Sequence, residues 1–219
     1  NKVMGTIASD IDNFVEHTTG NVLEIGMDRG EGSSIALITL AKRREVKYVG
    51  VDIIENTQWL QWQGQELEGC EFHVCTGESF AESTEDTFGI VYLDNFDWDY
   101  WATEYNARMG LRLPGNCMDG LKEQYEEHYP DLKDFSNEQS QIAHLTQIKL
   151  LNLDDNCVVI CDDTWFDILE GQWMGKCGAV VTYLQTEGFE VVCKRVQTIK
   201  QNPNGKTGYV IISRGHNES

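Results

Sequence analysis

Apolar and polar residues alternate along this chain in short segments that are typical of parallel β-strands connected by helices. The first half carries buried, mostly apolar runs of four or five residues, each followed by a stretch of helical periodicity, such as the apolar positions from Ile35 to Ala41. Strands that alternate with helices in this way form a parallel sheet with helical crossovers. The strands predicted here cover residues 22–25, 48–51, 71–75 and 89–93, with helices around 56–67 and from Glu78.

The second half continues the alternation and ends differently. A fifth strand is predicted at 157–161 and a helix over 171–186. Two last strands, 189–196 and 208–213, are separated by the turn sequence QNPNGK at 201–206. Because the connection is so short, these two strands form an antiparallel hairpin.

A glycine-rich turn follows the first strand. Gly26, Gly30 and Gly32 lie between that strand and the next helix, and glycine lets the backbone come close to a ligand. The second strand ends in Asp52, where a carboxylate is placed to accept hydrogen bonds from two ribose hydroxyls. The sequence therefore predicts a nucleoside-containing cofactor at this edge of the sheet.

The spacing of the glycines favours one cofactor over another. A dinucleotide site has GxGxxG, whereas this loop has GxxxGxG and contains Asp28 and Glu31. Carboxylates repel a pyrophosphate but suit the ammonium and sulfonium of S-adenosylmethionine. Together with Glu24, the pattern resembles the first two motifs of the class I S-adenosylmethionine-dependent methyltransferases. A nicotinamide oxidoreductase, which the spacing disfavours, is kept as an alternative.

The resemblance covers about residues 21–214 and implies a fold and a cofactor site. The fold is α/β and Rossmann-like, a doubly wound, mostly parallel seven-stranded sheet with an antiparallel last strand. Ligands in such sheets bind at the carboxyl ends of the strands. Glu78 and Ser79 are weaker candidates, since helix capping at Thr76 or Gly77 explains them equally well. The cofactor-binding candidates are Glu24, Gly26, Asp28, Gly30, Ser33, Asp52, Glu78 and Ser79.

Carboxylates also end the fourth and fifth strands. Asp94 follows the fourth strand, and the pair Asp162 and Asp163 follows the fifth. If these strands are neighbours, as in the family, the three carboxylates meet and repel one another unless a cation lies between them. Mg²⁺ or another divalent ion prefers such oxygen ligands. The sequence predicts Asp94, Asp162 and Asp163 as metal ligands, with helix capping by Asp163 as the alternative.

This arrangement resembles the metal site of the catechol-type and macrolide-sugar-type O-methyltransferases. The resemblance implies that Asp94 is a catalytic residue and that a hydroxyl of an aromatic or sugar-like small molecule receives the methyl group. The catechol enzymes place a lysine three residues after this aspartate, and this chain has Asp97 there. Asp97 is therefore the candidate base, with Asp99 or His128 as alternatives. A metal-independent methyltransferase and a non-catalytic S-adenosylmethionine-binding protein also stay open.

About sixty residues separate the fourth and fifth strands, more than a crossover needs. The excess, about 109–137, predicts a helical insertion that acts as a lid or as an oligomer contact. Aromatic residues, among them Trp98, Trp101 and Trp165, lie near the same edge and suit an aromatic or sugar acceptor, although part of them belong to the core.

Composition limits the class of protein. The 219 residues, 41% of them hydrophobic, predict one globular domain over 1–219. A net charge of −19 disfavours nucleic-acid partners, whose binding needs Lys and Arg. No apolar run reaches the length of about 18 residues that a membrane span needs. Seven cysteines without a CxxC pair indicate reduced thiols in a cytoplasmic protein and disfavour zinc. The expected partner is a small-molecule acceptor, and homo-oligomerisation stays open.

Overall fold

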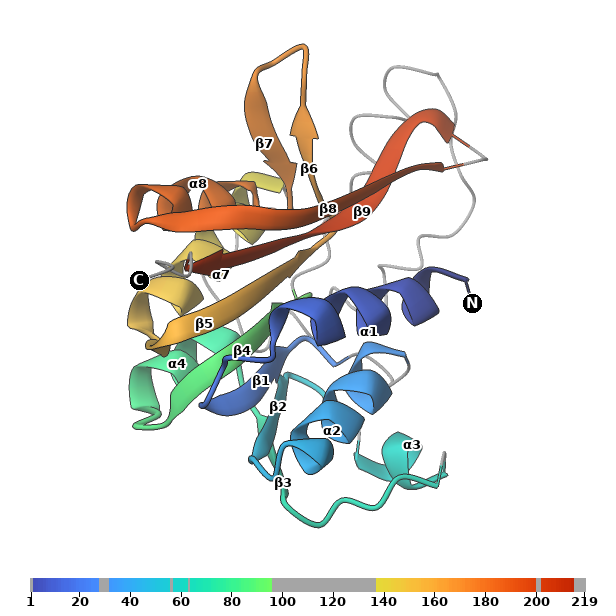
Figure 1. The fold of residues 1–219 in the computed structure, drawn as a ribbon, viewed down its shortest axis with the longest axis vertical. Helices are drawn as coiled ribbons and strands as arrows, with labels where there is room; N and C mark the ends of the chain where they lie inside the picture. Colours follow the sequence, from blue (N-terminus) through green and yellow to red (C-terminus); the bar gives the residue numbers. More distant parts are fainter. Residues whose placement is uncertain are drawn as a thin grey trace.

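A seven-stranded sheet forms the centre of the molecule (Figure 1). The computed structural model describes residues 2–27, 32–55, 57–62, 64–95, 137–199 and 202–214. The order of the strands in the sheet is β3-β2-β1-β4-β5-β9-β8. These strands are β1 Asn21–Ile25, β2 Tyr48–Asp52, β3 Cys70–Val74, β4 Thr87–Leu93, β5 Asn152–Asp162, β8 Phe189–Ile199 and β9 Asn202–Arg214.

The direction of the strands confirms the fold class. The pairs β1 with β2, β1 with β4, β2 with β3, and β4 with β5 are parallel. The last strand, β9, pairs antiparallel with both β5 and β8. The sheet is therefore Rossmann-like and mostly parallel, and strand order reverses between β1 and β4, where ligands of such sheets bind.

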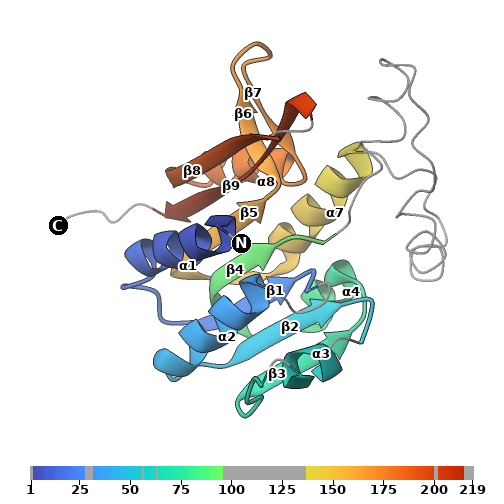
Figure 2. The same cartoon turned by 90° about the vertical axis from the view of Figure 1, so that its right-hand side faces the viewer.

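Helices cover both faces of the sheet, as the turned view shows (Figure 2). One face packs against α1, α2 and α3, and the other against α4, α7 and α8. Because consecutive strand residues point to opposite faces, Leu23 and Ile25 enter one core and Val22 the other. The helices are α1 Lys2–Phe14, α2 Ser33–Arg43, α3 Thr57–Trp62, α4 Gly77–Ser83, α7 Asn137–Leu150 and α8 Gly178–Thr186.

An ion pair fixes the N-terminal helix to the last two strands. Asp10 of α1 is buried and accepts hydrogen bonds from Arg195 Nε of β8 at 2.7 Å and from the Tyr209 hydroxyl of β9 at 2.7 Å. The bond from the guanidinium holds the pKa of Asp10 at about 2. Helix α1 lies beside α2 on the same face of the sheet and was not predicted from the sequence.

The helix predicted over 171–186 is partly wrong. Residues in its first part form the second strand of a hairpin, β6 Thr164–Asp167 with β7 Gln172–Gly175, and α8 starts only at Gly178. Gly171 and Gly175 have φ of 67° and 89°, which a helix does not allow. The rings of Phe166 and Trp173 pack across the hairpin with centroids 5.1 Å apart, as in other cross-strand aromatic pairs.

Other boundaries differ by less. Helix α3 is shorter than predicted, and β9 begins at Asn202, inside the predicted turn at 201–206. The predicted insertion at 109–137 lies outside the described residues, except for Asn137, where α7 begins.

The cysteines within the described ranges are free thiols, as predicted, and Cys157, Cys161 and Cys177 are buried. Cys117 lies outside those ranges. Among the helices described, none is both long and apolar enough to cross a membrane.

Candidate functional site

The carboxyl ends of β1, β2 and β4 meet around Gly26. The Gly26 amide donates a hydrogen bond of 2.9 Å to the carbonyl of Val51, and the Asp94 amide donates one of 2.9 Å to Ile25. Gly26 has a φ of 92°, and a Cβ there would lie 2.4 Å from the amide nitrogen of Asn95. Only glycine fits this conformation and this spacing, so the turn after β1 passes directly against the end of β4.

Asp52 connects the end of β2 to the same turn. Its Oδ2 accepts a hydrogen bond of 2.8 Å from the amide of Met27, and its Oδ1 accepts one of 3.1 Å from the amide of Ile54. Two backbone donors therefore orient the carboxylate at the carboxyl end of the strand. The predicted cofactor residues Gly26 and Asp52 lie together at this edge.

Glu24 lies inside the molecule, under the turn. It is fully buried and accepts hydrogen bonds from Ser33 Oγ, at 2.8 Å, and from the Tyr48 hydroxyl. Burial raises the pKa of Glu24 to about 7, because water no longer stabilises the charged form. Ser33, at the start of α2, thus connects the helix to Glu24, and this carboxyl changes its charge near neutral pH.

Glu78 and Ser79 have structural contacts that agree with the capping alternative. Thr76 is the N-cap of α4, and its hydroxyl oxygen accepts a hydrogen bond of 3.2 Å from the Ser79 amide. Glu78 Oε2 accepts a bond of 3.2 Å from Gln147 Nε2 of α7. A cofactor role of Glu78 and Ser79 stays a prediction.

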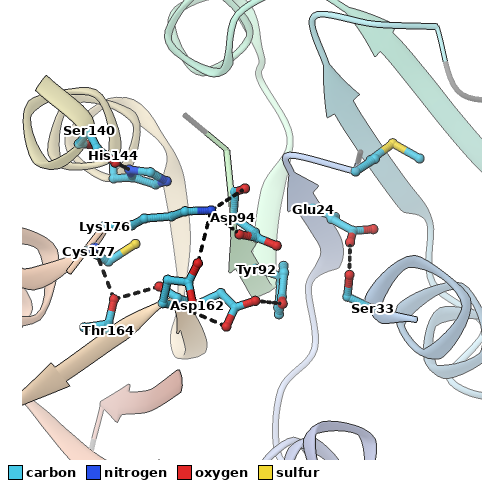
Figure 3. A network of polar contacts seen from close by, with 12 residues as sticks. Glu24, Ser33, Tyr92, Asp94, Ser140, His144, Asp162, Thr164, Lys176 and Cys177 are labelled. Carbon is cyan, nitrogen blue, oxygen red and sulfur yellow. Dashed lines mark hydrogen bonds and ion pairs between the residues drawn. The ribbon is translucent and has the colours of Figure 1, made fainter. Parts of the chain in front are cut away.

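The carboxylates at the ends of β4 and β5 lie around a lysine. Figure 3 shows the Lys176 side chain reaching toward Asp94, with Asp162 nearby. Lys176 Nζ donates to Asp94 Oδ1 at 2.6 Å and lies 3.6 Å from Asp163 Oδ2. Asp162 accepts a hydrogen bond of 2.6 Å from the Tyr92 hydroxyl. Burial raises the pKa of Asp94, the two neighbouring carboxylates add to that shift, and the Lys176 ammonium opposes it.

This cluster does not fit a magnesium site. The ammonium of Lys176 already occupies the position that a cation between the carboxylates would take. Asp162 uses one oxygen for Tyr92 and the other, Oδ1, for the amide of Asp163 at 2.9 Å. Over the ranges that the structure covers, no group of three or more His, Cys, Asp or Glu side chains is arranged to hold a metal ion.

Three candidate residues, Asp28, Gly30 and Asp97, lie outside the described residues, as do the alternatives Asp99 and His128. His144 of α7 is buried, and its Nδ1 lies 2.7 Å from the carbonyl oxygen of Ser140.

Sequence reasoning missed Lys176 and Tyr92. Lys176 follows β7, which lies inside the helix predicted over 171–186, and it is 82 residues from Asp94 in sequence. A signal did exist, since a buried strand ending in several carboxylates needs a compensating cation, and Lys176 is a basic residue in an otherwise apolar and glycine-rich stretch, WMGKCGAVV.

Comparison with known proteins gives matches of structure only. Neither a family model nor the sequence of a curated protein matches this chain. The N-methyltransferase NodS from Bradyrhizobium japonicum, in complex with S-adenosyl-L-homocysteine, matches with a TM-score of 0.55 and 12% identity over 99% of this chain and 89% of that one. Magnesium protoporphyrin IX methyltransferase from Synechocystis, with bound S-adenosylhomocysteine, matches with a TM-score of 0.53 and 12% identity over 98% and 83%.

A third structure agrees with these two. It is 1,6-didemethyltoxoflavin-N1-methyltransferase from Burkholderia thailandensis with bound 1,6-didemethyltoxoflavin and S-adenosylhomocysteine, and it matches with a TM-score of 0.51 and 14% identity over 97% of this chain and 77% of that one. All three matches cover nearly the whole of this chain. The chain therefore has the Rossmann-like fold of the class I S-adenosylmethionine-dependent methyltransferases.

Proposed function

We propose that this chain is an S-adenosylmethionine-dependent methyltransferase that acts on a small-molecule acceptor. The observation that carries the proposal is the carboxylate of Asp52, held by two backbone amides at the end of β2 and bonded to the turn after β1. An acidic side chain at this place in a Rossmann-like sheet suits the ribose of an adenosyl cofactor. The shared fold with three methyltransferases that bind S-adenosylhomocysteine supports it.

The residues around the turn have different roles in the proposed binding of the cofactor. Gly26 lets the turn after β1 lie directly against the end of β4, where a Cβ would meet the backbone of Asp94 and Asn95. Glu24, below the turn, provides a negative charge when ionised, which favours the cationic methionine end of the cofactor. Asp52 would accept hydrogen bonds from the ribose hydroxyls of the bound cofactor.

Asp94 ends β4 next to Gly26, and this position suits the acceptor. In the proposed reaction a lone pair of an acceptor oxygen attacks the methyl carbon, the C–O bond forms, and the C–S bond breaks to leave S-adenosylhomocysteine. The proton of the acceptor hydroxyl passes to Asp94 or to solvent. Alignment of the two reactants provides much of the rate. An amine acceptor follows the same scheme.

The magnesium-dependent form of this reaction finds no support in the arrangement of Asp94, Asp162 and Asp163 around Lys176. We therefore prefer the metal-independent alternative. A net charge of −19 argues for a small molecule rather than a nucleic acid as acceptor.

Turnover on a panel of acceptors tests this function. We expect S-adenosylhomocysteine, measured by mass spectrometry, to accumulate with S-adenosylmethionine and one class of hydroxyl or amine compound, at equal rates with Mg²⁺ and with EDTA. Binding of S-adenosylmethionine without turnover on any acceptor would favour the non-catalytic alternative. Loss of activity in EDTA that Mg²⁺ restores would bring back the metal-dependent one.

Replacing Asp52 by asparagine is expected to weaken binding of S-adenosylhomocysteine about ten- to thirtyfold, or roughly 1.5–2 kcal/mol. An amide group can accept at only one of its two ends, so one of the two backbone donors or a ribose hydroxyl loses its partner. Isothermal titration calorimetry measures the change. Glu55→Gln is the matched control, because it removes the same charge from an exposed position three residues further on. Equal affinities of Asp52→Asn and the control would contradict the ribose role.

A further inference from the structure

The ammonium of Lys176 lies among three oxygens at the ends of β4 and β5. Nζ is 2.6 Å from Asp94 Oδ1, 3.4 Å from the Asp94 carbonyl oxygen and 3.6 Å from Asp163 Oδ2. The Lys176 side chain is only 3% exposed, whereas those of Asp94 and Asp163 are 29% and 38% exposed. The ammonium is therefore more deeply buried than the two carboxylates beside it. Figure 3 shows the Lys176 side chain reaching toward Asp94.

The backbone around Lys176 is fixed by the β6–β7 hairpin. The Lys176 amide donates to the carbonyl of Asp163 at 3.1 Å, and the next amide, of Cys177, donates to Thr164 Oγ1 at 3.1 Å. The Thr164 hydroxyl donates in turn to the carbonyl of Asp162 at 2.8 Å. A Cβ on Gly175 would lie 1.9 Å from the Asp163 carbonyl oxygen, so only glycine allows this approach. Hydrogen bonds of the hairpin thus fix the backbone of Lys176 relative to Asp162 and Asp163 at the end of β5.

A divalent ion and this ammonium exclude one another. Mg²⁺ binds oxygens at about 2.0–2.1 Å, so an ion on Asp94 Oδ1 would lie within about 5 Å of an ammonium that is 2.6 Å from the same atom. Like charges this close repel strongly in a buried site.

We propose that the Lys176 ammonium is the resident cation of this carboxylate cluster, in the place where a metal-dependent enzyme binds its divalent ion. Lys176 is then a positioning residue that keeps Asp94 at the ligand edge. The inference rests on the proposed function only for what Asp94 does toward an acceptor. Whether an ammonium or a metal ion lies among these carboxylates can be measured in the cofactor-free protein and does not depend on methyl transfer.

The test is a titration of the cofactor-free protein with Mn²⁺, followed by electron paramagnetic resonance and by the melting temperature, Tm. Wild-type protein is expected to bind no Mn²⁺ at the cluster and to keep its Tm in Mn²⁺ and in EDTA. Lys176→Ala leaves the carboxylates around a space of ammonium size, so it is expected to gain a saturable Mn²⁺ site. At about a hundredfold excess over Kd, Mn²⁺ should raise the Tm of this variant by roughly 5–10 °C.

A control variant and a second cation make the test more specific. Lys47→Ala is the matched control, because Lys47 also contacts two carboxylates, Glu71 and Asp86, but on the surface, and its loss should create no saturable site. Ethylammonium should raise the Tm of Lys176→Ala but not of Lys47→Ala. If Lys176→Ala responds to neither Mn²⁺ nor ethylammonium, the proposal is overturned.

Mn²⁺ binding by the wild-type protein tests the proposal even if Lys176→Ala does not fold. Saturable Mn²⁺ binding by the wild type that Asp94→Asn abolishes would show a metal at the cluster and overturn the proposal. Equal, non-saturable signals from both proteins would support it. None of these readouts involves methyl transfer, so a failure of the proposed function would leave them unchanged.

Discussion

Gly26→Ala is expected to abolish binding of the cofactor and to lower the free energy of unfolding by more than about 3 kcal/mol. Two separate costs add at this position. The φ of 92° is unfavourable for any residue with a Cβ, and the added atom would lie within 2.6 Å of three backbone atoms of Asp94 and Asn95. Backbone atoms cannot move aside as a flexible side chain does, so β1 and β4 must separate where the cofactor binds.

Gly188→Ala measures the cost of the backbone conformation without the steric clash. Gly188 has a similar φ of 85°, but a Cβ there would meet nothing within 4 Å. We expect it to cost about 1–2 kcal/mol, the price of the backbone conformation alone, with unchanged affinity for S-adenosylhomocysteine. Urea unfolding and calorimetry measure both quantities. If the two alanine variants lost equal stability, the close contact between the turn after β1 and the end of β4 would not exist in solution.

Glu24→Gln is expected to have opposite effects on stability and on binding. Burial raises the pKa of Glu24 from 4.5 to about 7. The folded protein therefore binds a proton more tightly than the unfolded chain, and the wild type loses stability as the pH rises from 4.5 to 7. The difference of 7 − 4.5 = 2.5 pH units corresponds to about 3 kcal/mol. Glutamine stays neutral, so its stability relative to the wild type should rise by about 3 kcal/mol between pH 4 and pH 8.

The same substitution should weaken binding of S-adenosylmethionine. The ionised Glu24 favours the cationic end of S-adenosylmethionine, and glutamine lacks that charge. Urea unfolding at several pH values, with calorimetry at pH 8, measures the two effects. Glu190→Gln, at an exposed position of β8, is the control and should leave both pH dependence and affinity unchanged. A stability difference between Glu24→Gln and wild type that does not vary with pH would contradict a buried, neutralised Glu24.

The sheet could be predicted because its signals are local. Each parallel strand is a short apolar run, and the glycines after β1 with Asp52 after β2 mark the ligand edge within one stretch of sequence. The hairpin β6–β7 was not predicted, because β7 is only four residues long and lies directly before α8, so its sequence is predicted as the start of that helix. Only the pairing of Trp173 with Phe166 and the positive φ of Gly175 distinguish the two.

The carboxylates of the candidate site were predicted from the sequence, but the cation beside them, Lys176, was not. Strand order alone brings Asp94 and Asp162 together, since Leu93 pairs with Cys161 in the register of β4 and β5. The requirement for positive charge also followed from the sequence. Its source did not, because Lys176 reaches the cluster through the hairpin, and a long-range contact of this kind leaves no periodic signal.

A thermal-shift titration with S-adenosylmethionine, S-adenosylhomocysteine and NAD, each with Mg²⁺ and with EDTA, tests the central claim most directly. A ligand that binds only the folded state raises Tm in a concentration-dependent way. The account predicts stabilisation by both adenosyl compounds, none by NAD, and the same shifts in Mg²⁺ and in EDTA. A protein that responds to neither adenosyl compound, or that responds to NAD instead, would contradict it.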